Sequence, residues 1–557
     1  MSAIVMPIRV LVAALAAFLG ATLLVQYVAP STRGAAPARS RPAPGSAAGL
    51  VQHGTGVLSA YRDLGSVTRG QVSLVLTMRT RRFSSRSKGS MLHVDPFRSR
   101  YAPSAHSLRR VERYLRLRGL GVAPQLDGAW LLVRGAVDRV DRIFHIDVHR
   151  YGRRHLPAFE SSSPGTVPTD IRGMVSGAGR ISTMPIRTDI VPAGGFSPSG
   201  IQAAYDITPL INQGIDGRGQ TVVFVEIDGL DGASLKAYAA RFHLPPFHIT
   251  VHGPAFQPGD EATMDVEVVH AIAPMAKLVV YNIPGNTSNA EWDSRTAQMI
   301  SHVSGDVISE SVGLCESDWS AADLRALQLA YVKADLSGEA PFASTGDNGA
   351  FGCIQNGQVP STSNLGIQVP AGCPGVTAVG GTRLSVTSSG SWFDETAWED
   401  PIETGGSGGG PSIFFKQPGW QKAPGVAAQD ILNNPSHGRM VPDVSADADN
   451  ASGMDINLTG GRSEGGGTSQ AAPIWAAITA LADEYLGSHH HAPVGWMNPA
   501  LYHLASTKQP FPPFHDVVTG TNLNYPAATG YDMATGLGSP DAYNLARDLL
   551  HYSPAHP

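Results

Sequence analysis

The chain is poor in cysteine, with three residues in 557, and it contains no Cys-x-x-Cys pair. So few cysteines exclude a disulfide-dense scaffold, and the missing pair excludes zinc ribbons and thioredoxin-type redox motifs. Charged residues are only 16% and hydrophobic residues 42%, which excludes disorder throughout and provides for a large core. At roughly 100–200 residues per domain, the length predicts two to four domains.

Acidic residues are absent before Asp63, and the charge is unevenly distributed. Residues 1–190 hold 27 Lys and Arg against 10 Asp and Glu, whereas residues 191–557 hold 14 against 36. The balances are therefore +17 and −22. Such asymmetry indicates either binding to nucleic acid or a membrane, or binding of the two parts to each other. The Arg-rich stretch 109–118 lacks a nucleic-acid-binding motif, so we expect mutual binding and no nucleic-acid partner.

The N-terminus combines a basic residue with a long apolar run. Arg9 precedes the apolar residues 10–28, which is typical of a secretory signal and just long enough for a membrane anchor. The sequence therefore predicts a signal peptide or membrane anchor at 1–29, then a Pro/Ala-rich linker at 30–49. Either alternative predicts a location outside the cell or in the cell envelope, with a possible membrane tether.

Residues 50–190 alternate between predicted strands and helices, which indicates a small α+β domain. The strands are expected at 71–76 and 129–133, and the helices at 108–117 and 137–144. The connection 160–200 is rich in Ser, Pro, Gly and Thr and contains Arg180 and Arg187. We expect it to be exposed and open to proteolytic cutting.

Continuous apolar strands alternate with helical stretches from about residue 200 onward. Strands are expected at 221–225, 277–281, 306–309, 340–344 and 376–379, and helices at 233–242, 262–272, 321–336 and 469–486. This order predicts an α/β fold whose parallel sheet carries helices on both faces. In such sheets, functional sites lie at the carboxyl ends of the strands.

A serine follows a run of glycines in Gly465–Pro473 and precedes an apolar helix. Ser469 could simply be an N-cap after a flexible loop. Alternatively, it is a nucleophile whose anionic intermediate is stabilised by the helix dipole. The histidines are poor partners, because no Asp precedes His53 to orient its ring and His489–His491 lie in a Gly/Ser/Pro loop.

Carboxylates are better partners for this serine. Glu261 and Asp265 are four residues apart at the start of a predicted helix, so they lie on one face. They could be ordinary first-turn acids favoured by the helix dipole, or a pair that shares a proton and acts as a base in acid. Asp347 lies in a Gly-Asp-Asn-Gly turn directly after a buried strand, which is also a common connector.

Three motifs in this order closely resemble the sedolisin family, the serine-carboxyl peptidases that include kumamolisin. They are Glu-x-x-x-Asp at 261–265, Ser-Thr-Gly-Asp at 344–347 and Gly-Thr-Ser-x-x-x-Pro at 467–473. The resemblance covers residues 60–557. It implies a subtilisin-like fold in which a glutamate replaces the catalytic histidine. It also implies an activation propeptide at 50–190 and a peptidase domain at 191–557.

The resemblance implies a role for each motif residue. Ser469 would be the nucleophile, Glu261 its base, Asp265 the carboxylate that orients Glu261, and Asp347 the donor in the oxyanion hole. A carboxyl base works near its own pKa, and a carboxyl donor must be neutral, so we expect activity in acid. The expected function is a self-processing, serine-type endopeptidase zymogen that cleaves proteins or peptides. Its propeptide would be an intramolecular inhibitor.

The resemblance also implies one structural Ca²⁺ near the C-terminus. Asp516 and Asp532 would supply side chains, and Val517, Ala528 and Gly530 would supply carbonyl oxygens, a ligand set that suits a hard cation. An Asp-rich turn without metal is the alternative.

Some features depart from the family pattern. Val312 stands where some members carry an aromatic residue, and Glu226 matches a second glutamate of an extended network whose tryptophan partner is missing. Cys353 and Cys373 enclose a loop and could pair in an oxidising compartment, which would leave Cys315 unpaired; buried free thiols fit equally well. A catalytically inactive, membrane-anchored binding protein on the same fold is the alternative function.

Overall fold

The computed structural model describes residues 62–67, 70–80, 96–153, 156–161, 163–181, 195–302, 305–354, 361–400 and 405–552. The predicted signal peptide or anchor at 1–29, the linker at 30–49, His53 and Arg187 lie outside these ranges. Among the described residues, no helix is long and apolar enough to span a membrane.

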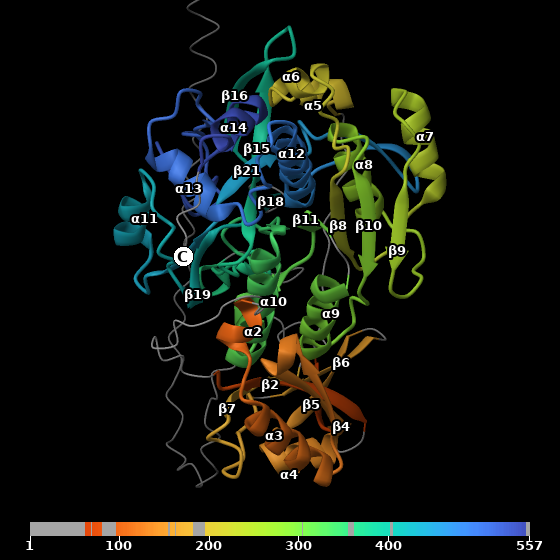
Figure 1. Cartoon of the computed structure of the whole chain (residues 1–557), viewed down its shortest axis with the longest axis vertical. Helices are drawn as coiled ribbons and strands as arrows, with labels where there is room; N and C mark the ends of the chain where they lie inside the picture. The colour runs from red at the N-terminus through yellow and green to blue at the C-terminus, as the bar shows by residue number, and fades with distance from the viewer. Residues whose placement is uncertain are drawn as a thin grey trace, which may run out of the picture. The chain divides into compact units, whose positions relative to one another are not determined.

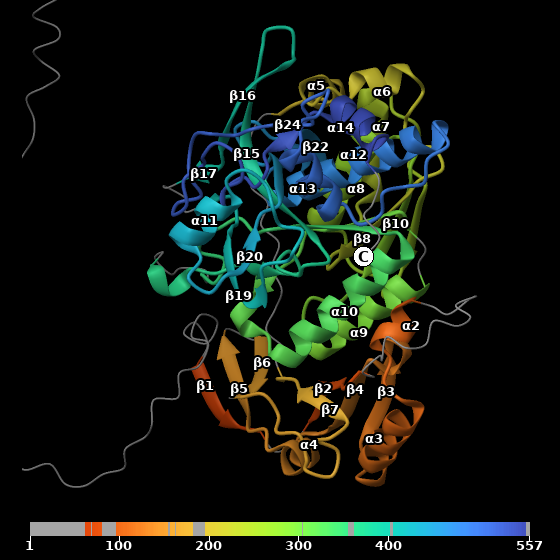
Figure 2. The ribbon, with the colours of Figure 1, turned by 60° about the vertical axis from the view of Figure 1, so that its left-hand side comes forward.

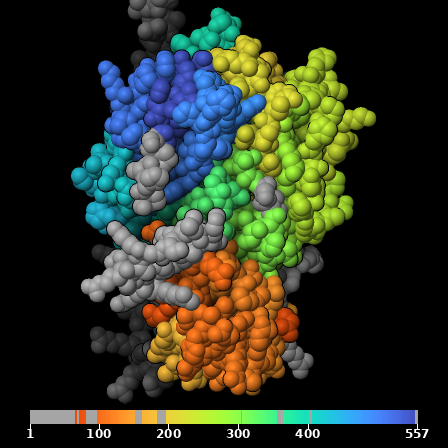
Figure 3. Space-filling model, in the orientation of Figure 1, coloured from red at the N-terminus to blue at the C-terminus, as the bar shows by residue number. Residues whose placement is uncertain are grey.

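Residues 62–181 form a small α+β unit, as predicted, with a four-stranded sheet of order β3-β4-β2-β7 and a three-stranded sheet of order β1-β5-β6. We call this unit the activation domain, the name that the family resemblance implies for it. Its elements are β1 (Arg62–Ser66), β2 (Gln71–Met78), α2 (Pro96–Tyr101), α3 (Ala105–Leu117), β3 (Gly121–Gln125), β4 (Trp130–Ala136), α4 (Val137–Phe144), β5 (Val148–Arg153), β6 (Leu156–Ser161) and β7 (Val175–Ala178). Many of its residues gather in the orange lower part of Figure 3.

Strand β2 confirms the strand expected at 71–76 but does not have the one buried and one exposed face that its alternating polar and apolar residues suggest. All of its residues from Val72 to Met78 are buried, because both faces of its sheet are covered. Leu74 packs into a core shared with α3 and α4, and Val75 into a second core that includes Trp292 and Tyr331. These two residues belong to α9 (Asn289–His302) and α10 (Ala321–Ser337), which lie beside the activation domain's sheet in both ribbon views (Figures 1 and 2).

The second part of the chain is built on an eight-stranded sheet of order β16-β15-β13-β11-β8-β10-β9, with β21 paired to β15. All pairs are parallel except β15 with β16. The strands are β8 (Thr221–Glu226), β9 (Ile249–His252), β10 (Lys277–Asn282), β11 (Val307–Glu310), β13 (Ala340–Ser344), β15 (Thr377–Val386), β16 (Trp392–Ala397) and β21 (Val444–Asp447). The predicted parallel sheet is confirmed.

Helices cover both faces of this sheet. In β8, Val222 and Phe224 face the core that contains α8 and α12, whereas Val223 and Val225 face the core that contains α9 and α10. The remaining helices are α5 (Pro198–Ala204), α6 (Thr208–Asn212), α7 (Gly232–Phe242), α8 (Glu261–Ile272), α11 (Val426–Asn433), α12 (Thr468–Ser488), α13 (Asn498–Ser506) and α14 (Ala542–Leu549).

Small two-stranded pairs complete the described part of the fold. They are β12 (Leu314–Cys315) with β14 (Gln368–Val369), β17 (Glu399–Asp400) with β18 (Gly405–Gly406), β19 (Gly410–Lys416) with β20 (Gly438–Val441), β22 (Asp455–Leu458) with β23 (Gly461–Glu464), and β24 (Phe514–His515) with β25 (Ser539–Pro540). Helix α9 escaped the sequence analysis because its buried face includes polar residues such as Asn289, Asp293 and Thr296, which hide the helical pattern.

Three neighbouring parallel strands bring their carboxyl ends to one edge of the sheet. β8 ends at Glu226, β11 at Glu310 and β13 at Ser344. Because β11 pairs with both other strands, the segments that follow all three strands meet there. The starts of α8 and α12 carry the predicted base and nucleophile, and these two helices pack against each other.

Candidate active site

Ser469 is the second residue of α12 and is almost fully buried. The preceding Gly467 has φ 75°, a left-handed conformation that favours glycine. Gly467 N also donates to the Ala448 carbonyl oxygen at 2.7 Å, which fixes the approach to the helix. The glycine run therefore sets the serine at the start of a buried helix, where the helix dipole favours negative charge.

Glu261 and Asp265 lie one turn apart at the start of α8, and both are buried. The N-cap residue Asp260 makes no side-chain capping bond. Instead Asp228, two residues beyond β8, accepts from Glu261 N at 3.2 Å and Ala262 N at 3.0 Å. Sequence analysis missed Asp228; its only signal was an aspartate just after a strand at the expected functional edge.

The pKa of Glu261 is raised well above its usual range. Burial is the main cause, the neighbouring Asp265 and Asp347 charges add to it, and the Ser469 side chain opposes it. Neither carboxylate oxygen of Glu261 has a hydrogen bond of ordinary geometry among the described residues. The contact between Glu261 and Ser469 is thus loose, which is common for catalytic pairs in unliganded enzymes.

Ser311 connects Asp265 to the nucleophile segment. Its Oγ lies 2.6 Å from Asp265 Oδ2 and 3.1 Å from the Ser469 carbonyl oxygen. The Ser311 hydroxyl donates to Asp265 Oδ2 over the shorter distance, and the Ser469 carbonyl oxygen is a second acceptor within its reach. Burial raises the pKa of Asp265 well above its usual range, and the hydrogen bond from Ser311 opposes this rise.

Asp347 follows β13 and is tied to the first residue of α12. Its Oδ1 accepts from Thr468 N at 2.7 Å and from Thr468 Oγ1 at 2.8 Å. Gly346 N donates in turn to Thr468 Oγ1 at 3.0 Å. The loop after β13 and the start of α12 therefore hold each other, with Thr468 as a contact that the sequence analysis did not single out.

The structure brings the four predicted catalytic residues together at the carboxyl edge of the sheet. Glu226, at the end of β8, extends the acidic group, because burial and then the Asp265 charge raise its pKa well above the usual range. Val312 is buried beside this edge. The buried carboxyl groups at this edge can exchange protons with the Ser469 hydroxyl, which is the requirement for nucleophilic catalysis with a carboxyl base.

The predicted calcium ligands lie in one loop region. Both oxygens of Asp516 accept from Gly530 N, at 3.1 and 3.0 Å, and Asp532 Oδ2 accepts from Ala528 N at 2.8 Å. Burial raises the pKa of Asp516 and raises that of Asp532 to about 6. The hard oxygen donors suit a Ca²⁺ ion that would restore the charged forms, although no cluster of three or more His, Cys, Asp or Glu side chains occurs in the described ranges.

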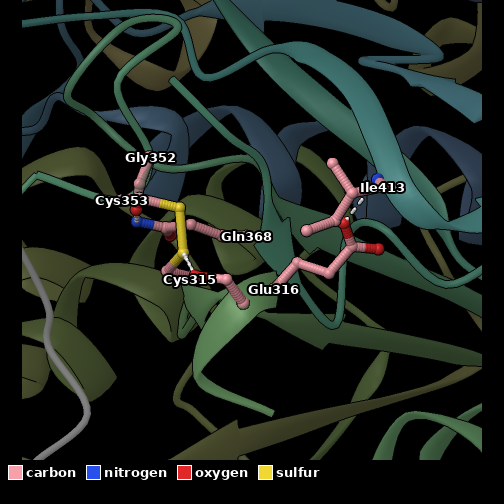
Figure 4. Close-up of a disulfide and its surroundings, with 7 residues drawn as sticks. Cys315, Glu316, Gly352, Cys353, Gln368 and Ile413 are labelled. Carbon is pink, nitrogen blue, oxygen red and sulfur yellow. Dashed lines mark hydrogen bonds between the residues drawn. A yellow bond between two sulfur atoms is a disulfide. The ribbon is translucent and has the colours of Figure 1, made fainter. Parts of the chain in front are cut away.

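The disulfide in the structure joins Cys315 to Cys353, with their α-carbons 4.8 Å apart (Figure 4). Pairing of Cys353 with Cys373, one of the alternatives left open by the sequence, is therefore wrong. Cys373 is a buried free thiol, and burial raises its pKa well above the usual range. The pairing of β12 with β14 carries Cys315 to the loop after β13, a contact between distant segments that spacing along the chain does not reveal.

Two family models match the chain. Residues 76–183 match the activation domain of pro-kumamolisin, and residues 254–507 match the subtilase family. The fold and the matched regions define a serine peptidase of the subtilase type that is made with an N-terminal activation domain.

Known relatives narrow this class. Kumamolisin of Bacillus sp. (strain MN-32) is 30% identical over 500 residues, which is 82% of this chain and 86% of the relative. Sedolisin of Pseudomonas sp. (strain 101) is 25% identical over 496 residues, 82% and 81% of the two chains. A solved structure of Pseudomonas sedolisin, a serine-carboxyl proteinase, complexed with two molecules of pseudo-iodotyrostatin, is 27% identical with a TM-score of 0.55. The match covers 64% of this chain and 98% of that one. The chain belongs to the sedolisin family of serine-carboxyl peptidases.

Proposed function

We propose that the chain is an acid-active endopeptidase that hydrolyses peptide bonds with Ser469, Glu261, Asp265 and Asp347. The observation that carries the proposal is the convergence of these side chains at one edge of the sheet, where all four residues are buried. A serine whose neighbours are carboxyl groups rather than histidine is suited to acid, where some of these groups are protonated and others are not.

The reaction starts when Ser469 Oγ attacks the substrate carbonyl carbon and its proton passes to the ionised Glu261. Asp347 is held at the start of α12 by the bonds from Thr468 to its Oδ1, and in its protonated form it would donate to the developing oxyanion. Protonated Glu261 then gives its proton to the leaving amine, which breaks the peptide bond and leaves an acyl-enzyme. Water, deprotonated by Glu261, completes the hydrolysis and releases Ser469.

Replacing the nucleophile tests this proposal directly. In the full-length chain, Ser469→Ala should abolish peptide hydrolysis in acid and leave the chain uncut. Ser488→Ala, at the other end of the same helix, is the matched control and should keep wild-type activity. Hydrolysis and self-processing by the Ser469→Ala variant would show that the nucleophile is assigned wrongly.

The activation domain is proposed to be an intramolecular inhibitor that is removed by self-processing. The proposed boundaries are those predicted from the sequence, a propeptide at 50–190 and a peptidase domain at 191–557. Exposure of the whole connection 160–200 is wrong, because Ile171, Val175 and Ile181 are buried in the activation domain. Cutting is therefore proposed in the part of this connection after Ile181. Val75, Trp130 and Leu132 share a core with α9 and α10, which supports a stable complex before cutting. Mass spectrometry of the processed N-terminus locates the cut.

One structural Ca²⁺ and an extracytoplasmic location complete the proposal. Asp516 and Asp532 would bind the ion with their side chains, and Val517, Ala528 and Gly530 with carbonyl oxygens. The disulfide between Cys315 and Cys353 suits secretion or a place in the cell envelope, since disulfides persist in oxidising compartments. Metal analysis of the purified protein tests the first point, and cell fractionation tests the second.

A further inference from the structure

A short sheet connects the segments that follow β11 and β13. β12 begins three residues after Ser311, and its Cys315 pairs with Gln368 of β14. The chain beyond Asp347 runs along the residues just before β14, where Phe351 forms a parallel bridge with Gly366. Residues 366–369 therefore contact both segments that carry groups of the candidate active site.

The side chain of Gln368 lies between these two segments. Its Nε2 donates to the Gly352 carbonyl oxygen at 3.3 Å. A Cβ added to Gly346 or to Gly313 would lie 2.6 Å from Gln368 Oε1, closer than real side chains approach. The two glycines thus leave room for the carboxamide. Gly346 directly precedes Asp347.

The Cys315–Cys353 disulfide and the Gln368 carboxamide close one ring of contacts around the loop that follows β13. Gln368 pairs through its backbone with Cys315, the disulfide leads to Cys353, and the neighbouring Gly352 accepts from the Gln368 side chain (Figure 4). One connection in this ring is covalent, and the side-chain connection is a neutral amide. A carboxamide does not titrate, so it donates equally well at every pH at which nearby carboxyl groups change charge.

We propose that Gln368 is a positioning residue that holds Gly346, and hence Asp347, in place relative to Ser469. The Cys315–Cys353 disulfide is the covalent part of the same ring of contacts. The inference rests on the proposed function, because it assigns Gln368 an effect through Asp347. A displacement of about 1 Å at a reacting group costs about 100-fold in rate, so a modest loosening of this loop is measurable.

Two substitutions at Gln368 test this role. Gln368→Met keeps the length but removes the donor, and should lower kcat about 10- to 100-fold at all pH values with little change in KM. Gln368→Glu should retain activity in strong acid, where the protonated carboxyl still donates. As pH rises through the usual glutamate range near 4.3, the carboxylate loses its hydrogen and kcat should fall on an additional descending limb. Gln298→Met, an exposed glutamine on α9, is the control.

Hydrogen exchange separates failure of this inference from failure of the proposed function. In the uncut full-length Ser469→Ala protein, adding Gln368→Met should speed exchange in residues 346–354, as should replacing both Cys315 and Cys353 by alanine. Unchanged exchange would show that this ring of contacts does not hold residues 346–354, whether or not the catalytic assignment is right. Faster exchange in the Ser469→Ala background with an unchanged kcat and pH profile in the active enzyme would overturn the positioning role of Gln368. Loss of the Ser469→Ala effect itself would instead refute the proposed function.

Discussion

The activation domain and the peptidase part have opposite net charges, and they differ in whether the charged side chains are exposed or buried. Most described arginines of the activation domain, such as Arg109, Arg110 and Arg113 on α3, are exposed, and none of its described carboxylates is buried. In the peptidase part, many acidic residues are buried in or beside the sheet, including Glu261, Asp265, Glu267, Asp293 and Glu310. Exposed arginines keep their charge across the accessible pH range, whereas buried carboxyl groups titrate at shifted values. The response to pH therefore belongs mainly to the peptidase part.

The contact between the two parts is more apolar than their net charges suggested. Its centre consists of hydrophobic residues from β2 and β4 packed with α9 and α10. Charged contacts accompany it. Arg134 donates twice to Glu291 at 2.6 Å, Ser73 Oγ donates to the same carboxylate at 2.7 Å, and Arg180 N donates to Asp323 Oδ2 at 3.2 Å. At the contact itself, the opposite charges expected from the sequence meet in the pair of Arg134 with Glu291.

The largest effect is expected at Glu261. It shows whether peptide hydrolysis depends on this particular buried carboxyl group or on the buried acidic residues of the peptidase part in general. Glu261→Gln should lower kcat by about 1,000-fold or more, because an amide cannot accept the serine proton. Glu267→Gln is the matched control on the same helix, since Glu267 is buried with its pKa raised to about 9 but lies outside the proposed machinery. It should leave kcat within about two-fold. Equal losses in both variants would contradict the assignment of Glu261.

A second effect concerns stability against pH. Burial raises the pKa of Glu310 to about 7, above its unfolded value of about 4.3. The protonated fold is then favoured, so this contribution to stability is complete below about pH 4 and is lost as pH rises through 7. Melting curves of the full-length Ser469→Ala protein should show a temperature that falls from pH 4 to 8.

Glu310→Gln sharpens this test because it keeps an acceptor for Tyr331 Oη, which lies 2.6 Å from Glu310. The variant should lose part of the pH dependence. Near neutrality its free energy of unfolding should exceed that of the parent by roughly 1.4 kcal/mol for each pH unit between the unfolded and folded pKa values of Glu310. A melting temperature that falls with pH as steeply as in the parent would show that Glu310 is not a source of the pH response.

A smaller effect is expected at the proposed calcium loop, which lies in the peptidase part alone. A chelator should lower the melting temperature, since an ion present at about 100 times its Kd stabilises the fold by about 2.7 kcal/mol. Asp516→Asn should reproduce the shift and abolish the response to the chelator, whereas Asp394→Asn, an exposed aspartate on β16, should do neither. A parent protein that melts identically with and without chelator would rule out the ion.

The smallest effect is expected at the charged contact between the two parts. Burial raises the pKa of Glu291, but hydrogen bonds from Arg134 and Ser73 outweigh it and lower the net value. The contact therefore stabilises the complex above the ordinary glutamate pKa and is lost as pH falls through the lowered value. Arg134→Ala should weaken the complex by about 1 kcal/mol, or about five-fold, and shorten the lifetime of the uncut chain near neutrality.

The matched control for this contact is Arg142→Ala. Arg142 pairs with Asp138 at 2.7 Å on the exposed face of α4, in the same domain but away from the peptidase part. Such surface pairs contribute little, so the lifetime of the uncut chain should stay unchanged. If both variants shorten the lifetime equally, the net charge of the activation domain matters and the individual contact with Glu291 does not.

Much of the fold and candidate site could be predicted from local sequence. The strand at 340–344 and the helix at 137–144 coincide with β13 and α4, because a continuous apolar run and a 3.6-residue pattern report directly on burial. The motifs around Glu261, Asp347 and Ser469 could be found because each one combines a glycine turn or helix start with a reactive side chain. Helix α9 could not, since its buried face contains Asp293 and Thr296.

The sequence by itself determined which residues carry reactive groups, the alternation of strands and helices, and the separation of charge along the chain. Only the tertiary structure decided that Cys315 pairs with Cys353, that β2 is covered on both faces, that Asp228 caps α8, and that Gln368 fits against two glycines. The physical reason is the separation in sequence over which each interaction acts. Periodicity and turn chemistry act within a few residues, whereas these contacts depend on the packing of segments that are distant in sequence, and the residues involved carry no local pattern that marks their partners.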